Sequence, residues 1–524
     1  MGSASTPSTP STAKPAGRSS AVAVPFLGVL GAIQGAAPNI ASTALVSASR
    51  SLHMASGEVA LAASTQTLAI AASVISTGLL ADRLGRRRVL MAALLVGTTG
   101  GVVVALSPAT AIYLLGQVLI GVGLGAVYGA AFAYIRAVAA PGKLAGAVGI
   151  FGATIGLATL VLTFVGGSIV AVNWRLSYLV IPALSLVAVF LVPIILPTEE
   201  RVRGSKQDVI GQILLALGII AFLYGVSELG HSLPSPKTLG PLAVGAVLIA
   251  AFFVFEAKNP NRFFPVALFR SPIFIAAILA GLVYNFGTAV AFLQCTNLWQ
   301  YVTGLKSSEV AVWQIPLVGA GVIGALLFGR LITKGMTNRL ALLIGAIMTA
   351  VGFVLLAIVN GSKSFMVFFP GLVLVGAGVV ICSIPFGNLV IKEAPPEQFG
   401  PVTSSRTTVG QFFYSIGFAL STVIIDKLTI GGVVDKLATA GVPPTQTGTA
   451  VSAVTVYAST GTDPSTTLGR QALADAVQSY GGAFATMMII AAAVAIVGGA
   501  VGYLLLLKAG EGSKDPMPAV TATA

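Results

Sequence analysis

The sequence is poor in charged residues. Asp, Glu, Lys and Arg make up 9% of its 524 residues, whereas hydrophobic residues make up 56% and the mean hydropathy is +0.95. A water-soluble protein carries far more charge on its surface, and no soluble core needs so much apolar area. The composition therefore excludes a soluble globular protein and predicts a chain that crosses a membrane many times.

Cysteine and histidine are also scarce, with two residues of each. Cys295 and Cys382 lie inside apolar runs, so we expect them to pack against neighbours rather than form a disulfide. His53 and His231 fall in separate predicted external loops. Because no nucleophile is placed with a base and no metal-ligand cluster is visible, we predict no catalytic residue, no metal and no cofactor.

The net charge of +13 does not indicate a nucleic-acid-binding surface. The basic residues gather at the ends of apolar runs instead of forming one solvated patch. Residues 1–20 are rich in Ser, Thr, Pro and Ala and contain no apolar core. They are predicted to be a disordered cytoplasmic tail rather than a cleaved signal sequence.

Fourteen apolar runs are long enough to span a bilayer, the first at 22–46 and the last two at 402–428 and 481–507. With the N-terminus inside, 21 of the 29 Lys and Arg residues fall on the cytoplasmic side. This asymmetry follows the positive-inside rule, and the even number of spans places both termini in the cytoplasm. We expect a multi-pass monomer in the inner (plasma) membrane of the cell.

A basic loop occurs twice. The segment GLLADRLGRRR starts at Gly78 after the second run, and GRLITKGMTNR starts at Gly329 after the tenth. Such an echo indicates two related six-helix halves. The predicted division is a cytoplasmic tail at 1–20, an N-terminal half at 21–196, a linker with two inserted helices at 197–271, a C-terminal half at 272–508 with an external loop at 429–480, and a cytoplasmic tail at 509–524. One short helix is expected within that loop, at 471–478.

The first loop carries a pattern more specific than basicity, which any short cytoplasmic loop can show. Gly78 precedes Asp82 by four residues, and Arg83, Gly85 and Arg86 follow. This order closely resembles the loop between helices 2 and 3 of the major facilitator superfamily. The fourteen runs, with strings such as VNWRLSY and TSSRTTVGQFFYSIGFAL, resemble its fourteen-helix drug:proton antiporter branch. The resemblance implies an all-α polytopic membrane protein with two six-helix halves and an inserted central pair.

The resemblance also implies a conformational gate. In the family the acidic residue of this loop meets the start of helix 13, in the other half of the protein. Arg406 lies at that helix start in this sequence and can add a charge pair with Asp82. The loop residues and Arg406 are therefore predicted to hold the two halves together on the cytoplasmic side.

The motifs that would carry proton exchange are altered. Ala37 stands where the antiporter branch has an Asp, and Gln117 stands where it has an Arg. No ionisable residue falls in the middle of a predicted span, although such residues usually mark ion or proton pathways. The remaining candidates for a proton-carrying residue, such as Glu58 and Glu309, lie near the ends of the spans. Their alternative role is to cap the start of a helix.

Uncharged polar residues occur on all four helices that line the cavity in the family, which are the first, fourth, ninth and twelfth. Each of them can instead form a hydrogen bond between helices. Their presence on all four helices favours a polar but neutral cavity, suited to a neutral or amphipathic solute. The residues predicted to line it are Gln34, Asn39, Gln117, Tyr128, Tyr284, Asn285, Gln294 and Asn388.

These observations predict a secondary transporter that exports a hydrophobic or amphipathic small molecule by alternating access, with protons as the coupling ion expected from the family. Its partners are then the small-molecule substrate and the lipid bilayer, and no nucleic acid. Two alternatives stay open: an uncoupled carrier or lipid exporter of the same fold, and a non-transporting membrane sensor or scaffold. The sensor would lack a polar cavity and would use its tails or the 429–480 loop for interactions.

Overall fold

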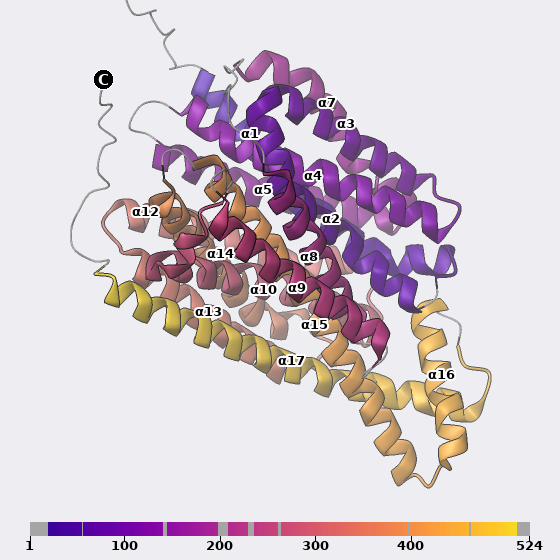
Figure 1. The fold of residues 1–524 in the computed structure, drawn as a ribbon. Helices are drawn as coiled ribbons and strands as arrows, with labels where there is room; N and C mark the ends of the chain where they lie inside the picture. The colour runs from indigo at the N-terminus through magenta and orange to yellow at the C-terminus, as the bar shows by residue number, and fades with distance from the viewer. Residues whose placement is uncertain are drawn as a thin grey trace, which may run out of the picture.

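The computed structural model describes residues 19–54, 56–139, 144–197, 208–228, 235–259, 264–395, 399–460 and 463–510. Within these ranges the chain is almost entirely helical and contains no strand (Figure 1). The predicted tails at 1–20 and 509–524 lie almost wholly outside them. The elements are α1 (Ser19–Ser51), α2 (Ser56–Leu84), α3 (Arg86–Ala105), α4 (Thr110–Val138), α5 (Leu144–Val170), α6 (Trp174–Ser177), α7 (Val180–Ile195), α8 (Val209–Glu228), α9 (Pro236–Lys258), η1 (Val266–Arg270), α10 (Pro272–Tyr301), α11 (Ser307–Trp313), α12 (Ile315–Thr333), α13 (Asn338–Ile358), α14 (Phe365–Glu393), α15 (Phe399–Thr439), α16 (Pro444–Thr460) and α17 (Thr467–Lys508).

The membrane spans agree with the prediction. Thirteen helical segments in the described ranges are long and apolar enough to cross a membrane, and α2 adds a shorter apolar stretch at Leu61–Val74. With α2 counted as a span, the total is the fourteen that the sequence predicts. The all-α polytopic fold is therefore confirmed.

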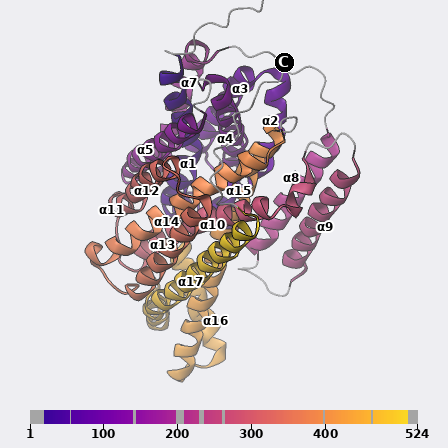
Figure 2. The same cartoon turned by 90° about the vertical axis from the view of Figure 1, so that its left-hand side faces the viewer.

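The buried apolar side chains form two large clusters. One cluster includes residues from Ala23 to Leu196, and the other includes residues from Phe252 to Leu506. Cys295 and Cys382 belong to the second cluster, and both are buried free thiols. Between the two clusters α2 packs against α15 and α8, while α5 packs against α11 and α12. The inserted helices α8 and α9 pack on each other at the flank of the bundle (Figure 2). The exact boundaries of the domain division remain predictions.

Small residues allow the closest helix crossings. A Cβ atom added to Gly31 of α1 would lie 2.9 Å from Ile155 of α5, and one added to Gly35 would lie 3.2 Å from Thr159. In lipid, where the hydrophobic effect does not press helices together, such close backbone approach is a main source of packing energy. The glycine-rich composition thus explains how α1 and α5 lie side by side.

The segment predicted as a loop at 429–480 is mostly helical instead. Helix α15 continues to Thr439, α16 follows, and α17 already begins at Thr467, so that the three helices project from the end of the bundle (Figure 1). A separate apolar cluster holds them together, formed by Val433, Leu437, Ala450, Val454, Ala472 and Ala476. Residues 471–478 are helical as expected, but they belong to the longer helix α17, because packing between the helices extends them beyond the spans.

Candidate substrate cavity

Asn39 of α1 lies where the two halves meet. Its Nδ2 donates a hydrogen bond to Thr163 Oγ1 of α5 (3.5 Å), and its Oδ1 accepts one from the hydroxyl of Tyr414 in α15 (3.2 Å). Only 6% of Asn39 is exposed. This predicted cavity residue therefore connects α1 to the C-terminal half, through a tyrosine that the sequence analysis did not single out.

Arg406 of α15 makes the second polar connection between the halves. Its Nη1 donates to the hydroxyl of Tyr128 on α4 (3.2 Å), and its Nη2 donates to the backbone carbonyl of Ser383 on α14 (3.5 Å). The guanidinium also lies 5.1 Å from the ring centre of Phe386 and 5.7 Å from that of Phe132. The cation is thus surrounded by aromatic side chains from both halves of the protein.

Two further residues shape the surroundings of this guanidinium. Gly387 of α14 faces it, since a Cβ atom there would lie 3.6 Å from Arg406 Nε, which is an ordinary van der Waals contact. Tyr284 of α10 lies within electrostatic range of both Arg406 and Tyr128. The structure therefore brings two predicted cavity residues, Tyr128 and Tyr284, to the same place as a residue predicted to act in the gate.

The position of Arg406 differs from the sequence-based expectation. The sequence placed it at the start of a span beginning at 402, but α15 begins at Phe399, so that Arg406 lies about two turns inside the helix. Its side chain points into the space between α4 and α14 rather than along the cytoplasmic surface. Arg406 nevertheless lies near the start of the membrane-spanning segment Ser405–Thr439, as the sequence predicts.

Gln117 of α4 is fully buried within the N-terminal half. Its Nε2 donates to the hydroxyls of Tyr113 (2.8 Å) and Tyr178 (3.1 Å), and these two hydroxyls lie 2.7 Å apart. Among the described residues, its Oε1 has no hydrogen-bond partner. The amide nitrogen is committed to this network, whereas a direct contact between Gln117 and substrate remains a prediction.

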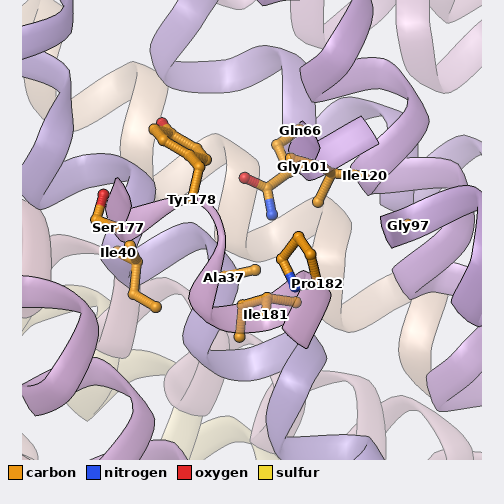
Figure 3. Close-up of a pocket in the computed structure, with 10 residues that line it drawn as sticks. All are labelled: Ala37, Ile40, Gln66, Gly97, Gly101, Ile120, Ser177, Tyr178, Ile181 and Pro182. Carbon is orange, nitrogen blue, oxygen red and sulfur yellow. The ribbon is translucent and has the colours of Figure 1, made fainter. Parts of the chain in front are cut away.

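A small, mainly apolar pocket lies beside this network (Figure 3). It has room for about one water molecule. Gln66 of α2 reaches into it, is only 3% exposed, and has no hydrogen-bond partner for either amide atom among the described residues. The sequence analysis missed Gln66, because an amide within an apolar run gives no sign of the side that it faces. The lining residues are Ala37, Ile40, Gln66, Gly97, Gly101, Ile120, Ser177, Tyr178, Ile181 and Pro182.

Most of the remaining predicted cavity residues have partners within their own half of the protein. Three of them bond within the C-terminal half: Gln294 Nε2 to Ser421 Oγ (2.7 Å), Asn285 Nδ2 to the Gly281 carbonyl (2.8 Å) and Asn388 Nδ2 to Asn338 Oδ1 (3.1 Å). Gln34 of α1 is buried, and its Nε2 has no partner within the described part of the chain. The described contacts thus join Tyr128 to Arg406, but they do not join all eight predicted residues in one site.

Residues 27–420 match the Major Facilitator Superfamily. The chain belongs to this superfamily. It is similar to the Tetracenomycin C resistance and export protein of Streptomyces glaucescens, with 26% identity over 399 residues that cover 75% of this chain and 73% of the relative. It is also similar to the multidrug resistance protein Stp of Mycobacterium tuberculosis, with 26% identity over 386 residues that cover 73% of this chain and 71% of that protein.

A solved structure agrees at the level of the fold. A bacterial homolog of the human lysosomal transporter Spinster, in an inward-facing and unoccupied conformation, superposes with a TM-score of 0.64 at 14% identity, covering 96% of this chain and 100% of that one. As a member of the superfamily, the protein is a multi-pass membrane carrier of small molecules and not an enzyme. The predicted resemblance and the predicted transporter class are confirmed.

The loop motif of the superfamily lies at the junction of α2 and α3. Gly78, Asp82 and Arg83 belong to the last turns of α2, and their side chains lie outside the described part of the structure. Gly85 has a φ of 94°, a backbone conformation that favours glycine, and α3 begins at Arg86. The glycine thus makes the sharp turn of the motif, while the predicted gate of Asp82 with Arg406 stays a prediction.

The carboxylate of Glu309 caps a helix in this carrier. It lies in the first turn of α11, and its Oε2 accepts a hydrogen bond from the backbone N–H of Lys306 (2.8 Å). Glu58 lies in the first turn of α2 in the same way. An anion at a helix N-terminus is stabilised by the unpaired N–H groups there, so the contact of Glu309 has an ordinary structural reason.

Proposed function

We propose that the protein exports a hydrophobic or amphipathic small molecule from the cytoplasm by alternating access. The observation that carries the proposal is the match to the superfamily over 27–420, together with relatives whose names describe drug resistance and export. The two halves would rock about a site near the middle of the membrane, as in other carriers built from two repeats. Both termini face the cytoplasm in this proposal, and the protein works as a monomer in the plasma membrane.

The contacts between the halves suit such a motion. Asn39 and Tyr414 share one neutral hydrogen bond, and Arg406 donates one to the neutral hydroxyl of Tyr128. Each bond of this kind contributes about 0.5–3 kcal/mol, so neither locks the protein in one state. Aromatic rings beside these contacts supply apolar surface for a hydrophobic solute.

Proton coupling is the finer part of the proposal. Ala37 and Gln117 replace titratable residues of the antiporter branch and cannot carry protons themselves. Any coupling must therefore use carboxylates outside these two positions. Transport driven by a substrate gradient alone is the simplest behaviour that these residues support.

The proposal is tested by export from cells. The protein would be produced in a bacterial host that lacks its own main drug exporters, and accumulation of a cationic dye (ethidium), a neutral lipophilic dye and an anionic fluorescent dye would be measured. We expect lower accumulation of at least one dye than in cells with the empty vector. Unchanged accumulation and unchanged drug resistance, with the protein present in the membrane, would contradict export and favour the sensor or scaffold.

The same protein in liposomes separates coupled from uncoupled transport. Efflux of the exported dye would be followed with and without an imposed pH gradient. We expect a substrate gradient to be sufficient. Accumulation against the dye gradient that requires the pH gradient would instead establish proton antiport.

A further inference from the structure

We infer that Arg406 binds an acidic group of the transported molecule, so that the preferred substrates are amphipathic organic anions with an aromatic or aliphatic body and a carboxylate. This inference rests on the proposed function and specifies the substrate class. It departs from the neutral lining that the sequence predicts.

The first argument concerns the charge of Arg406. Within the described part of the structure, its guanidinium contacts two neutral oxygens and two aromatic rings, and no carboxylate. Its Nε is buried and has no hydrogen-bond partner there. A guanidinium has five N–H donors, and a cation within a membrane usually faces a cavity and pairs with an anion. Among the described residues, the guanidinium therefore has no carboxylate partner and still has unused donors.

The second argument concerns the position of Arg406 between the halves. Its hydrogen-bond partners come from α4 and α14, which are two helices that line the substrate cavity in the superfamily. The side chain is only partly buried, so it is not fully enclosed by the protein. Gly387 keeps the side of α14 that faces the guanidinium free of a side chain. An anion can thus approach without displacing a large side chain of α14 at this point.

The third argument concerns the groups around the cation. The hydroxyl of Tyr128 accepts a hydrogen bond from Arg406, so its own hydrogen is available to donate to an incoming oxygen. Phe132 and Phe386 provide apolar walls on two sides of the guanidinium. A carboxylate attached to a hydrophobic body satisfies the charge, the donors and the apolar walls together.

Binding of two matched fluorescent probes tests this inference. 1-Pyrenebutanoate is anionic at pH 7, whereas 1-pyrenebutanol has the same ring and chain without the charge. Their affinities for the full-length protein in lipid nanodiscs would be measured by fluorescence anisotropy. We expect the wild type to bind the anion at least about tenfold more tightly, which corresponds to about 1.4 kcal/mol.

Three variants test whether Arg406 causes the preference for the anionic probe. Arg406→Gln should weaken binding of pyrenebutanoate about tenfold and change binding of pyrenebutanol less than about twofold. Arg406→Lys should keep part of the preference, because it retains the charge but loses the planar fork. Arg470→Gln, which removes an exposed arginine of α17, is the matched control and should bind both probes as the wild type does.

Two outcomes would overturn the inference: a wild type without preference for the anion, or an equal loss for both probes in Arg406→Gln. The second outcome would point to Arg406 as a latch between the halves, as the loop motif predicts. Either result leaves the proposed function standing if dye export in cells is intact. Anion-selective binding without any export in cells would instead overturn the proposed function and leave the anion site in place.

Discussion

For Gln117, the sequence and the structure suggest different roles. The family places it on a cavity helix, whereas its Nε2 donates to Tyr113 and Tyr178 inside the N-terminal half. Gln117→Leu removes both bonds at similar volume. Because a buried hydrogen bond contributes about 0.5–1.5 kcal/mol, we expect the stability of the N-terminal half to fall by about 1–3 kcal/mol.

The melting temperature of the purified protein, measured in one detergent, checks this expectation. Thr99→Val is the control, since Thr99 of α3 is exposed and bonds only to the Leu95 carbonyl of its own helix. We expect a lower melting temperature for Gln117→Leu only. An unchanged melting temperature together with weaker substrate binding would support the predicted contact between Gln117 and substrate.

The sequence predicts which residues are polar, but not which partners they meet. Asn39 and Tyr128 stand out because amides and phenols are rare in apolar runs. Their partners Tyr414 and Arg406 come from a helix hundreds of residues away, so no local pattern relates them. Gln66 shows the same limit, because its amide lies in an enclosed pocket that only the packing of several helices creates.

At the level of helices, Gly376 makes the tightest approach at the crossing of α12 and α14. A Cβ atom on Gly376 of α14 would overlap the backbone carbonyl of Leu317 in α12. Gly376→Ala must therefore push the two helices apart, and overpacking of this kind typically costs about 1–3 kcal/mol. We expect less folded protein and a lower melting temperature.

Gly319→Ala is the matched control for that crossing. It lies in α12, two residues from Leu317, and a Cβ atom there would meet nothing within 4 Å. Size-exclusion profiles in detergent should resemble the wild type for Gly319→Ala and show aggregation or loss for Gly376→Ala. Equal profiles for both variants would mean that α12 and α14 can move apart freely.

The start of α11 carries a prediction about coupling. Glu309→Gln keeps an oxygen that can accept from the Lys306 N–H but removes the anion near the helix dipole. We expect a loss of stability of about 0.3–1 kcal/mol and no change in the response of transport to a pH gradient. Liposome efflux at several pH gradients measures the response. If the gradient drives the wild type but no longer the variant, Glu309 is a proton site.

The sequence predicts the membrane-crossing part of the helices well, because the bilayer imposes length and apolarity on them locally. It does not predict where α15 ends or where α17 begins. Their extensions contain Thr, Gly and Ser, which give no periodic signal, and they are helical because Val433, Leu437 and Ala472 pack together. The start of α15 at Phe399 lies within one turn of the predicted start at 402.

At the level of the whole molecule, the contact between α5 and α11 tests whether the halves separate. A Cβ atom on Gly167 would lie 3.1 Å from Ala311 Cβ, close to the range of about 3.5–4.5 Å found in disulfides. The pair Gly167→Cys with Ala311→Cys should therefore crosslink under mild oxidation. In the proposed orientation this bond fixes the external ends of the halves together, so we expect export to stop and a reductant to restore it.

The two single variants are the controls, and the native Cys295 and Cys382 are buried and should not compete. The dye-export measurement in cells follows activity before and after oxidation. Full transport by a completely crosslinked protein would show that the halves do not part between α5 and α11.

The turn between α15 and α16 also makes the molecule accessible to labels. Gly441 has a φ of 76° there, and residues 438–441 are exposed. Exposed turn tips tolerate insertions because little packing depends on them. A short epitope inserted at this tip would be displayed at the end of the projecting helices and, in the proposed orientation, on the outer surface of the cell. Antibody staining of intact cells would then count the protein molecules at the surface and report which way the chain is threaded through the membrane.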